Sequence, residues 1–166
     1  MASPQTDHGV NTSQEVLRRR LIGVAAVTAV LATLHFTDHV IRGQLVLDRG
    51  LDPAWNHSGW PFQARFSPFT ISLILVYGLL LGGILLTFRK QAWAGYWLVT
   101  AILLGAVVTQ VHFAPGPNTE SPSVIIDTYG SRAVGITAVS ITFAIVATLI
   151  AMAAQAIWVR RVTGRW

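Results

Sequence analysis

Four long uncharged runs constrain this chain more than any other feature. They cover residues 21–37, 66–88, 91–114 and 133–159. A helix needs about 20 mostly apolar residues to cross about 30 Å of hydrocarbon, and the last three runs meet that need directly. The first run meets it only if its helix continues past Asp38 toward Arg42, so we expect that it does.

The composition agrees with a surface that is wetted by lipid. Only 11% of the residues are charged and 52% are hydrophobic, whereas soluble domains carry about 25% charged residues. We therefore expect an all-α integral membrane protein, a four-transmembrane-helix bundle with spans at about 20–41, 67–88, 92–113 and 132–158. These spans belong to one domain, residues 18–166, with two longer outer loops. Residues 1–17 are polar and are predicted to form a disordered cytoplasmic tail.

The basic residues predict the orientation of the bundle. Eight fall on one side of the predicted spans: Arg18, Arg19, Arg20, Arg89, Lys90, Arg160, Arg161 and Arg165. Four fall on the other side: Arg42, Arg49, Arg65 and Arg132. Because the basic excess marks the cytoplasmic side, both termini are expected in the cytoplasm and the protein in the inner (plasma) membrane of a bacterium. The net charge of +5 forms no basic face, so nucleic-acid binding is not predicted.

The first span has an alternative interpretation as a secretory signal peptide. A basic cluster precedes an apolar run, and cleavage would fall near Ala32-Thr33. The cluster begins late, at residue 18, and the small-residue pattern at the cleavage point is poor. We therefore expect the span to be retained, and cleavage would leave the other three spans unchanged.

The histidines gather toward the predicted outer side. His35, His39 and Arg42 share one helix face, because residues three or four apart lie on the same side of a helix. At about 1.5 Å per residue, His39 and His112 each lie roughly 27 Å from the inner boundary of the hydrocarbon. Two helices therefore carry histidines at matching depth, and His57 lies in the loop that could cover them. We expect the imidazoles of His35, His39 and His112 to converge.

Converging imidazoles predict a metal or haem site. The chain has no cysteine, so histidine, carboxylate or water would supply the ligands, and imidazole suits Zn, Cu and Fe. The candidate metal ligands are His35, His39, His112, His57 and Asp38. Haem b, held between a first-span histidine and His112, is the alternative cofactor. The structural alternative is that these imidazoles are hydrated polar groups, with Asp38 and Arg42 forming an ordinary ion pair.

No reaction follows from the sequence. It contains no Gly-rich phosphate loop, no Gly-x-Ser-x-Gly and no His-Glu-x-x-His. The leading hypothesis is a small multi-pass membrane protein whose histidine-rich site serves electron transfer or metal handling. The alternatives are a non-catalytic accessory subunit that packs against a larger membrane complex, a homo-oligomer, and a small transporter. A transporter needs a continuous polar path, which the sequence does not reveal.

Overall fold

The computed structural model describes residues 7–48, 68–90, 94–114 and 120–164. This part of the chain contains five α-helices and no strand: α1 (Asp7–Asp48), α2 (Pro68–Phe88), α3 (Ala94–His112), α4 (Pro122–Thr128) and α5 (Arg132–Thr163). All except the short α4 are long and apolar enough to cross a membrane. The predicted all-helical architecture with four such helices is confirmed.

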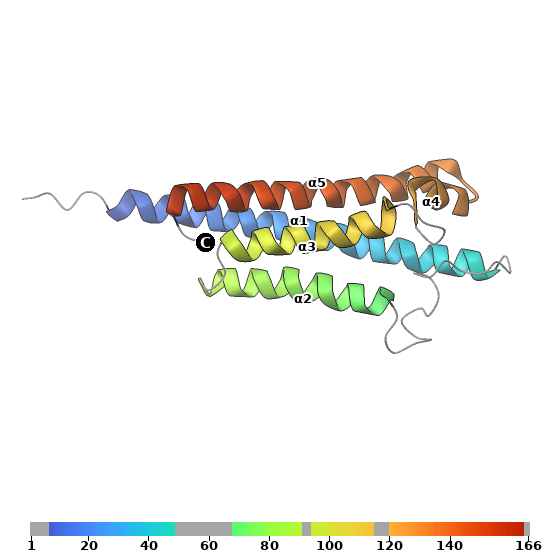
Figure 1. Cartoon of the computed structure of the whole chain (residues 1–166), viewed down its shortest axis with the longest axis horizontal. Coiled ribbons are helices and arrows are strands. Elements are labelled where there is room, and N and C mark those ends of the chain that lie inside the picture. The colour runs from blue at the N-terminus through green and yellow to red at the C-terminus, as the bar shows by residue number, and fades with distance from the viewer. Residues whose placement is uncertain (1–6, 49–67, 91–93, 115–119, 165–166) are drawn as a thin grey trace, which may run out of the picture.

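The four long helices alternate in direction along the bundle (Figure 1). The long helix α5 packs against α1 and α3, and α2 packs mainly against α1. The start of α1 and the end of α5 lie at the same end of the bundle. At the opposite end, where α1 and α3 finish, α4 folds back onto α5. We call this opposite end the α4 end.

The interior is apolar through most of the bundle, and so is much of the exterior. Leu21, Leu80 and Met152 are at most 2% exposed, whereas Ile74 and Ile150 are 66% and 65% exposed. Exposed large apolar side chains occur on all four long helices. A surface of this kind suits contact with the hydrocarbon of a bilayer.

The first helix is longer than expected at both ends. It continues through Asp38 and Arg42 to Asp48, which confirms the predicted continuation. It also begins at Asp7, so residues 7–17 are helical there, which differs from the expected disordered tail. Glu15 forms ion pairs with Arg18 at 2.5 Å and with Arg19 at 3.1 Å, and these pairs stabilise the turn of α1 at residues 15–19. The predicted ligand His57 lies in residues 49–67, outside the described residues.

The helix α4 was not predicted. Ser121 caps its start, because the side chain accepts a hydrogen bond from the Val124 N–H, and proline follows in the first turn. Its Ile125 is 1% exposed and packs in a small apolar cluster with residues of α5. Gly135 permits the close approach of α4 to α5, since a Cβ there would lie 2.7 Å from Cα of Ile126. The connection between α3 and α5, predicted as the second outer loop, therefore contains a docked helix.

Candidate metal centre

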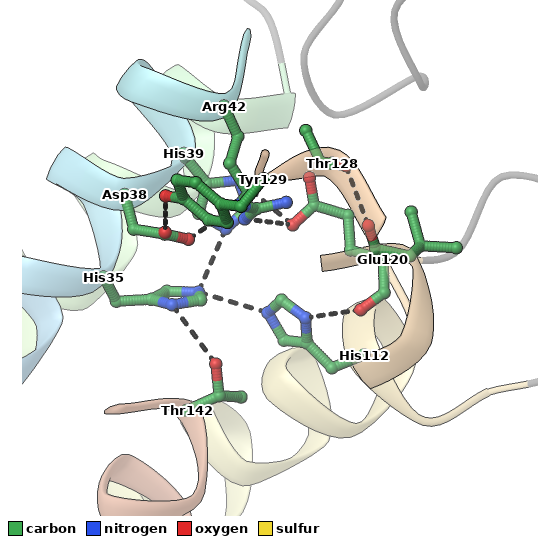
Figure 2. A network of polar contacts seen from close by, with 10 residues as sticks. His35, Asp38, His39, Arg42, His112, Glu120, Thr128, Tyr129 and Thr142 are labelled. Carbon is green, nitrogen blue, oxygen red and sulfur yellow. Dashed lines mark hydrogen bonds and ion pairs between the residues drawn. The ribbon is translucent and has the colours of Figure 1, made fainter. Parts of the chain in front are cut away.

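Three imidazoles meet inside the α4 end of the bundle (Figure 2). His35 and His39 lie one turn apart on α1, and His112 is the last residue of α3. Nε2 of His35 lies 3.0 Å from Nε2 of His39 and 3.1 Å from Nε2 of His112. The three residues are only 7%, 5% and 2% exposed. The structure thus brings together the three histidines that the sequence singled out, and one ligand nitrogen from each lies within 4.8 Å of the others.

The second nitrogen of each ring faces an oxygen atom. Nδ1 of His112 lies 3.0 Å from the backbone carbonyl of Glu120, and Nδ1 of His39 lies 3.3 Å from the Oε2 atom of Glu120. Nδ1 of His35 lies 3.4 Å from the hydroxyl of Thr142 on α5. A carbonyl oxygen only accepts, so the proton of a neutral His112 belongs on Nδ1. The nearby carboxylate of Glu120 favours the same tautomer of a neutral His39. Their Nε2 atoms then present lone pairs toward His35.

This arrangement leaves a place for one cation. If His35 carries its proton on Nε2, it can donate well to only one of the two facing lone pairs. If His35 carries its proton on Nδ1, toward Thr142, the Nε2 lone pairs of His35, His39 and His112 converge on one point. Metal–imidazole bonds of about 2.0–2.1 Å at tetrahedral angles place neighbouring nitrogens roughly 3.3 Å apart. Two of the three observed separations, 3.0 and 3.1 Å, are close to that value, and the third pair of nitrogens lies within 4.8 Å.

The same geometry does not fit haem b between His35 and His112. Axial nitrogens on opposite faces of a porphyrin would lie roughly 4 Å apart, at about 2.0 Å from the iron on each side. The Nε2 atoms of His35 and His112 are closer, at 3.1 Å, and their ring centroids are 4.9 Å apart at 72°. A macrocycle cannot lie between rings in direct contact. The rings of His35 and His112 therefore leave no room for haem between them, whereas the ring centroids of the other expected pair, His39 and His112, lie 5.9 Å apart.

A buried ionic network adjoins the imidazoles. Arg42 donates from Nε to Asp38 at 2.7 Å and from Nη2 to Glu120 at 2.9 Å. The hydroxyl of Tyr129 also donates to Asp38. Asp38 therefore forms the ion pair considered in the sequence analysis, and it lies outside the group of three ligand nitrogens.

The formal charge of this network favours a nearby cation. Arg42 and Glu120 are fully buried and Asp38 is 7% exposed. Two carboxylates against one guanidinium leave one excess negative charge when all three are ionised. Buried charges are stabilised only when they are paired. A cation among the neutral imidazoles would offset this excess negative charge.

Tyr129 lies between α4 and α5, outside the four candidate spans. Burial raises the pKa of its phenol, and the hydrogen bond to Asp38 raises that pKa further. The hydroxyl therefore stays protonated at neutral pH and remains a donor to Asp38. This bond ties the segment after α4 to α1.

Glu120 is fixed at the end of α3 by its own backbone. Its N–H donates to the carbonyl of Val111 at 3.0 Å, and its carbonyl faces His112. Glu120, Tyr129 and Thr142 were not predicted as site residues. The Ser121-Pro122 pair is a helix-start signal that could have placed Glu120 at an ordered position. No local pattern indicates Thr142, which is 107 residues from His35 in sequence.

A small, partly open cavity of about 70 Å³ lies beside the imidazoles. Its walls come from α1, α2, α3 and α5, and most of its lining side chains are apolar. His35, His39 and His112 contribute to the same lining. The candidate metal centre therefore borders an apolar space inside the bundle.

Neither a known protein family, nor a curated protein, nor a solved structure matches this chain.

Proposed function

We propose that this chain is a multi-pass plasma-membrane protein that binds one transition-metal ion through His35, His39 and His112. The observation that carries the proposal is the convergence of three Nε2 atoms from rings that each have an oxygen within 3.4 Å of Nδ1. Histidines that bind metals are oriented in this way, because the partner at the other nitrogen selects the tautomer and fixes the ring.

The ligand set narrows the choice of metal. Three imidazoles without a thiolate suit Zn, Cu or Fe. Three protein ligands also leave a coordination position for an external group, which is typical of reactive sites rather than closed structural ones. The site therefore serves electron transfer or metal handling. His57 remains a predicted fourth ligand.

The proposed orientation rests on the charges at the two ends. Arg18, Lys90 and Arg160 adjoin the end opposite α4, where α1 begins and α5 finishes. By the positive-inside tendency, that end and both termini lie in the cytoplasm. The metal centre then lies near the outer boundary of the membrane.

Metal analysis of the purified protein tests the proposal. We expect about one ion per chain after loading with Zn²⁺, Cu⁺ or Fe²⁺ and removal of loosely bound metal. His112→Gln should lose that ion. A matched double variant, Gln110→His with His112→Gln, keeps the number of histidines but moves the imidazole to an exposed position on the same helix. It should not recover binding, whereas Gln110→His alone should bind normally. A wild-type chain that retains none of these metals, or a His112→Gln variant that binds as well as the wild type, would overturn the proposal.

A further inference from the structure

The polar partners of the three imidazoles do not reach the cavity beside them. Nδ1 of His39 and Nδ1 of His112 face oxygen atoms of Glu120, and Nδ1 of His35 faces the hydroxyl of Thr142 (Figure 2). All three imidazoles line the cavity, whereas Glu120 and Thr142 do not. The other members of the ionic network are also absent from the lining: Asp38, Arg42 and Tyr129. The candidate metal centre therefore has its polar contacts outside the cavity.

The rest of the cavity lining is almost entirely apolar. Besides the histidines, Thr28 and Ser72 are the only polar side chains that line it in the described part of the chain. Thr28 already donates its hydroxyl proton to the carbonyl of Val24 at 2.8 Å. A water molecule in a protein interior is held by about two to four polar partners, and apolar cavities stay dry. An uncharged apolar molecule therefore fits this cavity better than water does.

The volume of about 70 Å³ limits the size of an occupant. An apolar cavity of about 150 Å³ accepts a benzene ring, whereas one water molecule takes up about 30 Å³ of the liquid. The cavity beside the imidazoles lies between these two volumes. It therefore accommodates a molecule of roughly two or three heavy atoms and is too small for a six-membered ring or a long alkyl chain.

The charge around the imidazoles also favours an uncharged occupant. Asp38 and Glu120 share one guanidinium, that of Arg42, which leaves one excess negative charge when all three are ionised. A monovalent cation at the imidazoles offsets that charge. An anion in the cavity would restore a net negative charge, and none of the described lining residues is a lysine or an arginine. Burial of an unpaired charge is costly, so the cavity disfavours anions.

We propose that the cavity admits a small uncharged diatomic molecule, of the class that includes carbon monoxide and dioxygen, as the fourth ligand of a Cu⁺ ion at His35, His39 and His112. This inference rests on the proposed metal centre and selects one metal for it. Imidazole suits copper, and three protein ligands leave a coordination position for an external molecule. Carbon monoxide binds by coordination through its carbon alone, so no bond in the ligand breaks and the copper stays monovalent.

Infrared spectroscopy of bound carbon monoxide tests the inference. The full chain in detergent is loaded with Cu⁺ without air, its copper content is measured, and carbon monoxide is added. We expect a C–O stretching band whose intensity follows the copper content and whose frequency falls with ¹³CO. Azide, a small anion, should not weaken the band. A copper-loaded wild type without this band, or one in which azide displaces carbon monoxide, would overturn the inference.

A matched pair of variants on α2 tests whether the cavity holds the ligand. Val76→Phe fills the cavity from the helix that carries no metal ligand, so carbon monoxide bound per copper should fall several-fold while copper content stays unchanged. Ile74→Phe adds the same ring at a position 66% exposed and should have no effect. If Val76→Phe also loses copper, Ser72→Leu, at another lining position of α2, replaces it. Wild-type binding of carbon monoxide per copper in the cavity-filling variant would contradict the inference.

The metal centre and the gas ligand fail in different ways. A chain that retains Cu⁺ but binds no carbon monoxide keeps the metal centre and loses the ligand. A chain that binds Zn²⁺ but not Cu⁺ also keeps the metal centre and overturns the inference. A chain that binds no metal overturns both proposals. His112→Gln should lose copper and carbon monoxide together.

Discussion

Glu120 and His39 are joined across the α4 end of the bundle, with 3.3 Å between the carboxylate Oε2 atom and Nδ1 of the imidazole. The same glutamate faces His112 through its backbone carbonyl at 3.0 Å. One residue therefore orients imidazoles from two helices. It also pairs with Arg42, so the orientation of the ligands is coupled to the ionic network.

Replacing Glu120 should weaken metal binding without removing a ligand. Glu120→Gln removes the negative charge beside His39, and loss of such an orienting partner typically lowers metal affinity roughly 10- to 100-fold. Competition with a chelator of known affinity measures the change. Asp127→Asn is the matched control, because Asp127 is an exposed carboxylate on the neighbouring α4. Equal affinities in the two variants would show that Glu120 does not orient the site.

Replacing Arg42 should destabilise the fold. Arg42→Ala leaves the carboxylates of Asp38 and Glu120 buried without their shared guanidinium, and breaking a buried ion pair in this way costs about 3–5 kcal/mol. Arg42→Lys keeps the charge, but a single ammonium cannot reproduce the two hydrogen bonds that the guanidinium donates to Asp38 and Glu120. Its loss of unfolding free energy should therefore be smaller than that of Arg42→Ala. Reversible unfolding in mixed micelles measures the free energy. Arg19→Ala, at a side chain 78% exposed, should change it by less than about 0.5 kcal/mol.

The hydroxyl of Tyr129 predicts a loss of stability at alkaline pH. The pKa of this phenol is raised in the folded state by burial and by Asp38, whereas in the unfolded chain it is about 10. The contribution of the hydroxyl is therefore complete below about pH 10 and is lost as pH rises toward the folded pKa. The difference in melting temperature between wild type and Tyr129→Phe should be constant from pH 7 to 9 and should shrink above pH 10. A difference that grows above pH 10 would contradict this assignment.

Gly135 tests whether the docking of α4 supports the metal centre. A Cβ at this position would lie 2.7 Å from Cα of Ile126, so Gly135→Ala should push α4 from α5 at a cost of about 1–3 kcal/mol. Glu120 directly precedes the cap of α4, so metal affinity should fall as well. Gly105→Ala is the control, because a Cβ there meets nothing within 4 Å. Unchanged metal affinity in Gly135→Ala would show that the docking of α4 does not support the metal centre.

Much of the scaffold could be predicted from the sequence because hydrophobic runs and helical spacing are local signals. The shared face of His35 and His39 follows from their separation by four residues. The matching depth of His112 follows from the rise of a helix. These two regularities predict three imidazoles that the structure brings together.

The surroundings of the imidazoles could not be predicted in the same way. The contact between Glu120 and Arg42 joins residues 78 apart, and it depends on a loop whose path no periodicity specifies. Thr142 carries no signal beyond that of any hydroxyl on a membrane helix. Depth alone does not specify how closely two helices approach, so the sequence could not show that the rings of His35 and His112 lie too close for haem between them.

X-ray absorption at the metal edge tests whether His35, His39 and His112 bind the ion. For the zinc- or copper-loaded protein, we expect about three imidazole nitrogens at about 2.0 Å, with the outer-shell scattering that imidazole rings produce. The spectrum of His112→Gln should lose one of these rings or show no bound metal. A wild-type spectrum with only oxygen neighbours and no imidazole scattering would show that His35, His39 and His112 do not bind the ion.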